Sequence, residues 1–334
     1  MRAAVTTNVL TDQPVRVTDW PDPTVPAGWA LVRLRAAALN RLDRMLLDDR
    51  SSLPGPSILG SDGAGVVAAA GKGADVEVGA EVVISPSLHW GTGVDAPHED
   101  YEILGSPTDG THAELVAVPA ENLYPKPDRL TWREAAALPM AGVTAWRALV
   151  SRGRLQRGET VVVAAASSGL GSFALQIAAG LGARVVAVTS SGSKPEVARS
   201  LGADVVVLRD QPDFVDALTA ATDGCADVAL DPTGALWQPL LQSVRPGGRL
   251  VAVGKMASES ATVRVQTVYW KQVDILGSSM GSPRDFAAFL AHVDDASWTP
   301  LVDSTHPLDD IETAYARLDS PARTGKVVID LPVR

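Results

Sequence analysis

A segment of small residues, ASSGLG at positions 166–171, joins a strand-like run (161–163) to a helix-like run (173–178). A turn between a strand and a helix can bind a pyrophosphate, because its backbone N–H groups are free and the helix dipole is positive there. The dinucleotide fingerprint in such a turn is G-x-G-x-x-G; this segment keeps only part of its glycine content. We predict that a pyrophosphate binds the N–H groups of Ser168, Gly169, Leu170 and Gly171; the alternative is a tight turn without a ligand.

Residues about 20 positions further on separate NAD from NADP in such folds, because an Asp or Glu there binds the ribose hydroxyls of NAD. No carboxylate stands directly after Thr189 in this chain. Ser190, Ser191 and Lys194 follow instead, and hydroxyls and an ammonium favour a 2′-phosphate. These residues predict NADPH as the cofactor; an ordinary serine-rich loop is the alternative.

Two later strand-like runs end in residues that could contact the other half of the cofactor. Asp231 and Thr233 lie in DPTG, and Gly254 closes RPGGRLVAVG. In open parallel sheets the ligand lies at the carboxyl ends of the strands. We predict that these three residues line the nicotinamide half of the site; turn chemistry is the alternative explanation.

The elements that must position these residues alternate between strand and helix. Strands are expected at 160–165, 184–189, 204–208, 226–230, 248–253 and 273–278, and helices near 170–181, 194–201, 213–221 and 236–243. Such alternation predicts βαβ units and a parallel sheet covered on both faces.

The rest of the chain has a different texture. Short Val- and Ala-rich runs separated by Gly and Pro predict a β-rich domain before residue 120, and the last segment returns to that pattern. We expect an α/β protein in which residues 1–125 and 279–334 form one domain. Residues 126–278 would form an inserted nucleotide-binding domain, with the active site in the cleft between the two.

Composition excludes several classes of function. A formal net charge of −10 argues against a nucleic-acid surface, which needs clustered Lys and Arg. No apolar run approaches the roughly 20 residues that span a bilayer, and the first residues lack the apolar core of a signal peptide. The single cysteine, Cys225, excludes an internal disulfide and a thiolate-rich metal site. We expect a soluble cytoplasmic protein that does not bind nucleic acid or membrane.

Several motifs in one order resemble the medium-chain dehydrogenase/reductase superfamily, and within it the zinc-free quinone oxidoreductase branch. They run from LVRLRAAALNRLDRML through ILGSDGAGVV, GTHAELVAVP, AAALPMAGVTAWRAL and the ASSGLG turn to DPTG, RPGGRLVAVG and TGKVVID. The resemblance covers essentially the whole chain. It implies a GroES-like catalytic domain, a Rossmann domain for the cofactor and a homodimer.

Zinc enzymes of the superfamily bind their catalytic metal with Cys, His and Cys. The resemblance places Asn40, Ser61 and Met140 at those positions, and the cysteine-free 85–104 loop in place of the structural zinc lobe. An amide, a hydroxyl and a thioether do not make a catalytic zinc site, so we predict no metal. Other potential ligands cluster in the loop, but solvated loop residues explain them better: His89, Asp95, His98, Glu99 and Asp100. His89 and Trp90 are either part of the cleft wall or loop packing.

Without a metal, the suitable acceptors of a hydride are those that delocalise negative charge, namely quinones and α,β-unsaturated carbonyl compounds. The resemblance places Asn40 and Asp43 at the floor of the cleft and Thr144 near the nicotinamide, and we predict these as the catalytic residues. Asn40 as a helix cap and Thr144 as a plain helix residue are the alternatives. We expect an NADPH-dependent quinone or enone reductase. A cofactor-binding sensor or structural protein with little turnover, and a reductase of acyl thioesters, are the other readings.

Overall fold

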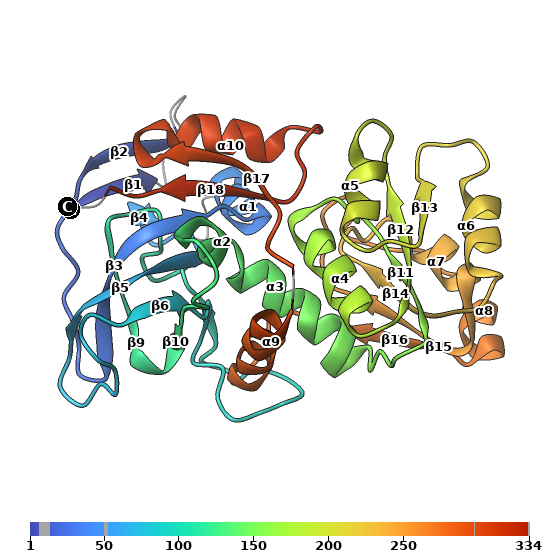
Figure 1. The fold of residues 1–334 in the computed structure, drawn as a ribbon, viewed down its shortest axis with the longest axis horizontal. Helices are drawn as coiled ribbons and strands as arrows, with labels where there is room; N and C mark the ends of the chain where they lie inside the picture. The colour runs from blue at the N-terminus through green and yellow to red at the C-terminus, as the bar shows by residue number, and fades with distance from the viewer. Residues whose placement is uncertain (7–13, 50–52, 297, 333–334) are drawn as a thin grey trace. The chain divides into compact units, whose positions relative to one another are not determined.

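The computed structural model describes residues 1–6, 14–49, 53–296 and 298–332. It divides into two compact units (Figure 1): Met1–Met140 together with Ser282–Arg334, and Ala141–Gly281. One unit has a parallel sheet with flanking helices, and the other has a mostly antiparallel sheet. This arrangement confirms the α/β class expected from the sequence.

The first unit is built around a large mixed sheet. In the described residues its order is β10-β6-β5-β3-β18-β17, with β9 also paired to β3. These strands are β3 (Trp29–Ala38), β5 (Asp62–Ala70), β6 (Glu81–Ile84), β9 (Leu115–Pro119), β10 (Leu123–Pro125), β17 (Val302–Pro307) and β18 (Lys326–Asp330). Buried and half-buried residues alternate along most of β3, as expected when one face of a strand covers a core. Since β18 pairs with β3 at Val328 and Ala38, the C-terminal strand brings Lys326 to the segment that follows β3.

Smaller elements complete this unit. The small strands are β1 (Arg2–Thr6), β2 (Val15–Asp19), β4 (Ser57–Ile58), β7 (Ser87–Leu88) and β8 (Glu102–Ile103). The helices are α1 (Arg41–Asp48), α2 (Trp132–Ala137), α9 (Pro283–Asp295) and α10 (Ile311–Asp319). Because α2 packs against β3, β5 and β18, the chain stays in the first unit as far as Met140. The boundaries predicted from the sequence, 125–126 and 278–279, differ from those of the two units, which lie after Met140 and after Gly281.

The second unit has a six-stranded sheet in the described residues, ordered β13-β12-β11-β14-β15-β16, and every pairing in it is parallel. The strands are β11 (Thr160–Val163), β12 (Arg184–Thr189), β13 (Val205–Leu208), β14 (Ala226–Asp231), β15 (Val244–Ala252) and β16 (Asp274–Gly277). Numbered along the chain, this is the doubly wound order 3-2-1-4-5-6, in which a nucleotide binds where the order reverses, beside β11.

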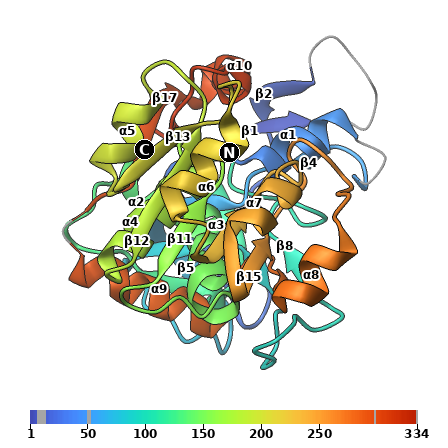
Figure 2. The ribbon, with the colours of Figure 1, turned by 90° about the vertical axis from the view of Figure 1, so that its right-hand side faces the viewer.

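Helices cover both faces of the second sheet (Figures 1 and 2). They are α4 (Gly169–Gly180), α5 (Lys194–Ser200), α6 (Phe214–Thr222), α7 (Trp237–Ser243) and α8 (Val265–Lys271); α3 (Pro139–Trp146) precedes them. Helix α3 starts at Pro139 and runs into a π-helix at Arg147–Arg152. The buried positions of β11, β12 and β14 are almost all Val, Ala or Leu, which is typical of strands covered on both sides.

Candidate active site

A buried cluster of charged and polar groups lies in the first unit where β3, β5 and β18 end or begin. The Lys326 ammonium donates to the carbonyl of Leu39 at 2.9 Å, to Asn40 Oδ1 at 2.5 Å and to Asp62 Oδ2 at 2.8 Å. Lys326 is 3% exposed and Asp62 is fully buried. All three N–H groups of the ammonium therefore have acceptors, as a buried cation requires.

The same cluster fixes the amide of Asn40. Asn40 Nδ2 donates to Asp62 Oδ2 at 2.9 Å, while its oxygen accepts from Lys326. An ammonium only donates and a carboxylate only accepts, so one orientation of the amide satisfies both partners. The side chain of Asn40 thus belongs to this cluster, whereas its backbone N–H donates to Asp43 at the start of α1. One N–H of the amide remains for another acceptor.

The atoms at the family's zinc positions do not suit a catalytic zinc. The amide oxygen of Asn40 already accepts from Lys326, Ser61 offers a hydroxyl and Met140 a thioether. Asp62, next to Ser61, accepts from the backbone N–H of Met140 at 2.7 Å through its second oxygen. A catalytic zinc needs three strong donors and an open position. In the part of the chain that the structure describes, no three His, Cys, Asp or Glu residues form a group that could hold a metal ion.

Asp43 is more deeply buried than its predicted place at the floor of a cleft suggests. It is 1% exposed, and its carboxylate accepts from the backbone N–H of Asn40 at 2.6 Å, at the start of α1. Burial raises the pKa of Asp43 to about 7, against the smaller opposing effects of the Asn40 N–H and Lys326. This geometry is that of a helix-capping carboxylate.

Two further buried side chains interact with this cluster, Tyr315 with Asp43 and His112 with Lys326. The Tyr315 hydroxyl lies 3.4 Å from His112 Nδ1. Burial lowers the pKa of His112 to about 3, and burial together with the charge of Asp43 raises the pKa of Tyr315 well above its usual value. Both side chains are therefore neutral near pH 7.

Thr144 lies in the second unit, in the middle of α3. Its hydroxyl is 3.9 Å from the sulfur of Met280, and its side chain is 6% exposed. Its predicted position near the nicotinamide stays a prediction.

The ASSGLG turn offers fewer free donors than the sequence suggested. Ser168 is the N-cap of α4, and its hydroxyl accepts from the N–H of Gly171 at 3.0 Å. The N–H of Ser168 donates to Ala165 O at 2.9 Å. Of the four N–H groups predicted to hold a pyrophosphate, those of Ser168 and Gly171 are therefore already bonded. The N–H groups of Gly169 and Leu170, in the first turn of α4, are the ones that helical geometry leaves open.

Gly171 explains why part of the fingerprint is kept. A Cβ there would lie 2.3 Å from Ala165 O, so only glycine lets α4 start this close to the turn. The turn is also tied to the next strand, because Ser167 Oγ lies 3.1 Å from Thr189 Oγ1 at the end of β12. This is the packing that a dinucleotide-binding turn needs, and a nicotinamide dinucleotide would be held here by Gly169, Leu170 and the residues after β12.

The predicted phosphate-binding residues after β12 come together with one acid, Asp210, that does not follow this strand in sequence. Lys194 Nζ donates to Ser190 Oγ at 3.1 Å. Ser191 donates to Asp210 Oδ2 from its hydroxyl at 2.7 Å and from its backbone N–H at 3.3 Å. No acid follows Thr189 in sequence, yet one reaches this loop from the end of the neighbouring strand. The signal available was the position of Asp210 after the third strand of the alternating region.

The residues predicted for the nicotinamide half are engaged in their own loops. Asp231 is fully buried, and its Oδ1 accepts from the backbone N–H and the hydroxyl of Thr233 at 2.7 and 2.6 Å. A Cβ on Gly254 would lie 2.7 Å from Pro232 O, so the loops after β14 and β15 need a glycine to approach one another. These contacts favour the turn-chemistry alternative for Asp231 and Gly254.

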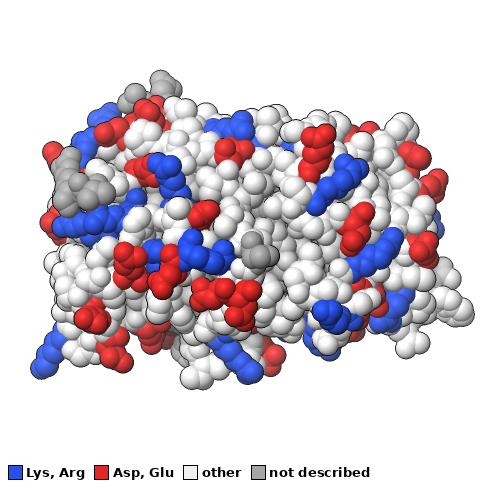
Figure 3. Space-filling model, in the orientation of Figure 1, with Lys and Arg blue, Asp and Glu red and all other residues white. Residues whose placement is uncertain are grey.

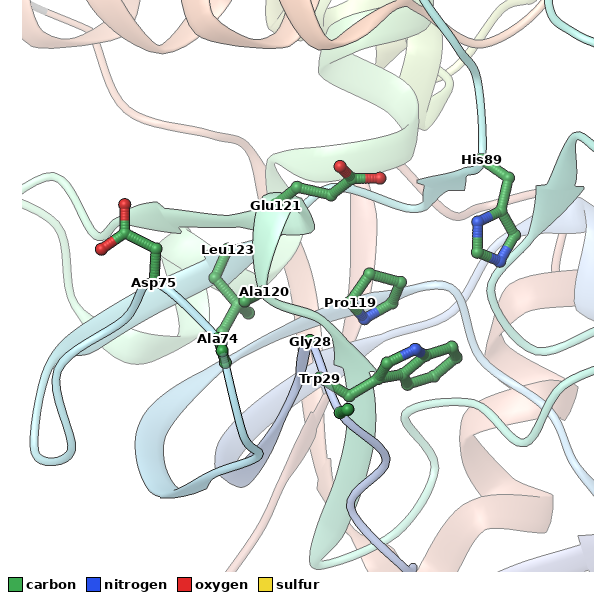
Figure 4. Close-up of a pocket in the computed structure, with 11 residues that line it drawn as sticks. Gly28, Trp29, Ala74, Asp75, His89, Pro119, Ala120, Glu121 and Leu123 are labelled. Carbon is green, nitrogen blue, oxygen red and sulfur yellow. The ribbon is translucent and has the colours of Figure 1, made fainter.

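A separate pocket of about 580 Å³ lies in the first unit (Figure 4). His89 and Trp29 border it with Pro119 and Glu121, and the His89 and Trp29 rings are 6.4 Å apart. Trp29 begins β3 and Asn40 follows its end, roughly 30 Å away along an extended strand. This pocket is therefore distinct from the Asn40 cluster. Trp90 is buried against Tyr101, with ring centroids 5.1 Å apart, which is the loop packing considered above.

The surface carries both signs of charge. On the face in Figure 3, Lys and Arg side chains are interspersed with Asp and Glu, without one basic field. None of the helices in the described residues is both long and apolar enough to cross a bilayer.

Comparison with known proteins identifies the family. Residues 26–128 match the alcohol dehydrogenase GroES-like domain, and residues 169–295 match the zinc-binding dehydrogenase family. The chain is 30% identical over 317 residues to a zinc-type alcohol dehydrogenase-like protein of Schizosaccharomyces pombe, covering 91% of each chain. It belongs to the medium-chain dehydrogenase/reductase superfamily, and is an oxidoreductase of the kind that uses a nicotinamide cofactor.

Two other relatives bear on the chemistry. A crystal structure of an NAD-dependent alcohol dehydrogenase superposes with a TM-score of 0.93 at 35% identity, covering 99% of this chain and 100% of that one. A crotonyl-CoA reductase of Streptomyces avermitilis is 36% identical over 225 residues, which are 59% of this chain and 50% of the reductase.

Proposed function

We propose that the protein is a zinc-independent, NADPH-dependent reductase that transfers a hydride to a quinone or an α,β-unsaturated carbonyl compound. The cluster around Asn40 carries this proposal. At the positions of the family's zinc ligands the chain has an amide, a hydroxyl and a thioether, and the amide is bonded to Lys326 and Asp62. A saturated carbonyl would need a metal or a strong acid for its developing alkoxide, whereas an enolate or a hydroquinone anion delocalises its charge.

The chain's own residues would orient the acceptor and balance its charge. The cofactor supplies the hydride when bound. The second N–H of the Asn40 amide can donate to a carbonyl oxygen, in an orientation fixed by Lys326 and Asp62. Thr144 stays our candidate beside the nicotinamide, and Asp43 holds the start of α1 behind Asn40. A single fixed donor suits an acceptor whose negative charge is already spread.

Lys194 and Ser190 support NADPH over NADH, because an ammonium and a hydroxyl favour a 2′-phosphate. The NAD-dependent relative shows that the fold also serves NADH. The crotonyl-CoA reductase relative acts, by its name, on a conjugated thioester, which is also an α,β-unsaturated carbonyl compound. Enoyl thioesters therefore join quinones and simple enones as candidate acceptors.

The test is NADPH oxidation with a panel of acceptors: a 1,4-naphthoquinone, a cyclic enone and crotonyl-CoA, with ethanol and NADP⁺ for the reverse reaction. We expect turnover of at least one conjugated acceptor and negligible oxidation of ethanol. Ethanol oxidation at a rate comparable with acceptor reduction would contradict the proposal. Tight NADPH binding with no turnover of any acceptor would instead favour the sensor or structural alternative.

We also propose a cytoplasmic homodimer. Strand β16 is an edge of the second sheet in the described residues, and α8, which packs against β15, exposes Val265, Tyr269 and Trp270 at 73, 62 and 77%. Open edges and large exposed apolar side chains are usually covered in the native assembly. Light scattering should give twice the chain mass, and Trp270→Ser should lower it toward that of a monomer. A single cysteine is in keeping with a reducing compartment.

A further inference from the structure

The carboxyl ends of β12 and β13 bring opposite charges to the predicted nucleotide site. The two strands are parallel neighbours, with Thr189 paired to Leu208. Lys194 is bonded to Ser190, and Asp210 is bonded to Ser191, the next residue along the same loop. An ammonium and a carboxylate are therefore bonded to two adjacent serines of the loop that would contact the adenosine ribose.

The position of the Asp210 carboxylate is fixed by Ser191. One oxygen, Oδ2, accepts from both the hydroxyl and the backbone N–H of that residue. These hydrogen bonds, and to a smaller extent the charge of Arg209, lower the pKa of Asp210, so it is ionised at neutral pH. The residue is exposed, so its carboxylate is accessible from solvent.

We propose that Asp210 is a specificity-determining residue of the nucleotide site, which favours the ribose hydroxyls of NADH and opposes the 2′-phosphate of NADPH. The inference rests on the proposed cofactor site. A fixed carboxylate accepts from a hydroxyl and repels a phosphate, which carries up to two negative charges, whereas Lys194 does the reverse. Cofactor choice is then a balance between two residues that are bonded to the same loop, and the positive charge of Arg209 acts in the same direction as that of Lys194.

This role differs from that of a loop tether. If Asp210 only held the loop through Ser191, its loss would affect both cofactors in the same direction. A role in specificity moves the two affinities in opposite directions. The ratio of the dissociation constants for NADH and NADPH therefore separates the two explanations without any measurement of turnover.

The experiment is calorimetric titration of NADPH and NADH into the wild-type protein, Asp210→Asn and Asp213→Asn. Asp213 is an exposed acid just before α6, so its variant makes the same change in net charge away from Ser191. We expect Asp210→Asn to bind NADPH about threefold more tightly and NADH about tenfold more weakly. Asp213→Asn should leave the ratio within about twofold of the wild type.

A ratio in Asp210→Asn that matches the control, or a parallel change in both affinities, overturns the inference and leaves the proposed function intact. Binding of neither cofactor to the wild-type protein overturns both.

Discussion

The ammonium of Lys326 lies 2.8 Å from the carboxylate of Asp62, and both side chains are almost entirely buried in the first unit. They come from strands far apart in sequence, β18 and β5, which β3 separates in the sheet. Asn40 completes the cluster by accepting from one and donating to the other. A charge pair thus stands beside Asn40, which the resemblance places at the first zinc-ligand position.

Breaking this pair should destabilise the protein strongly. Lys326→Met leaves the Asp62 carboxylate buried without its cation, and we expect a loss of about 3–5 kcal/mol in the free energy of unfolding. The double variant Asp62→Asn/Lys326→Met removes both charges and should recover much of that loss. Urea unfolding of the three proteins measures both effects. A single variant as stable as the wild type would mean that the pair is not buried as described.

Asp43 should make stability depend on pH. Its pKa is about 7 in the folded protein against an ordinary 3.8, so the folded state holds a proton that the unfolded chain releases between those values. The resulting stabilisation, about 4 kcal/mol at most, is complete below pH 4 and is lost as the pH rises through 7. Asp43→Asn has no carboxyl proton to lose. Its free energy of unfolding should therefore rise relative to that of the wild type between about pH 5 and pH 8, the range around the Asp43 pKa of about 7.

The difference between the two proteins is the quantity to measure, because His112 acts in the opposite direction. Its pKa is lowered to about 3, so its contribution is lost as the pH falls below the ordinary value of 6.5. His112 is present in both proteins and cancels in the comparison. A difference in unfolding free energy that is the same at both ends of the pH range would contradict the assignment for Asp43.

Asn40→Ala should lower kcat for a conjugated acceptor about ten- to hundredfold, because one hydrogen-bond donor to the developing oxyanion is lost. The dissociation constant for NADPH should not change, since the predicted cofactor residues belong to the second unit. Ser61→Ala, at the next family ligand position, is the matched control and should keep its activity. Equal losses in the two variants would point to a structural or metal-binding role instead.

Lys194→Ala should weaken NADPH binding about ten- to hundredfold and leave NADH nearly unchanged. The reason is the loss of one charge-assisted contact to the 2′-phosphate, worth roughly 1.5–3 kcal/mol. Titration of both cofactors into wild type and variant measures this. An unchanged NADPH affinity would mean that the bond between Lys194 and Ser190 is only part of the loop structure.

The sequence predicted the second unit well because its signals are local. Helix α5 begins at the predicted residue, and β12 has the predicted bounds, since each is a short Val-rich or polar run between glycine-containing turns. Helix α8 was missed because it is only seven residues long and none of its residues is buried. Strand β17, with the sequence VDSTHP, was missed because it is polar and only half-buried beside β18.

The candidate site was only partly predictable, because its contacts join distant segments. Asn40 could be singled out from the resemblance to the zinc-enzyme motif, but Asp62 and Lys326 come together through the pairing of β5, β3 and β18. A charged residue inside each of two otherwise small-residue or apolar segments, LGSDGAGVV and TGKVVID, was the available signal. Asp210 was missed for the same reason, since it meets Ser191 across two parallel strands.

Metal dependence is measured most directly by the rate of NADPH oxidation with a conjugated acceptor after exhaustive treatment with a chelator, with zinc determined on the same sample. We expect no stoichiometric zinc before treatment and an unchanged rate after it, because Asn40, Ser61 and Met140 do not provide three strong ligands. About one zinc per chain, lost together with activity and restored with it when the metal is returned, would contradict the proposed chemistry.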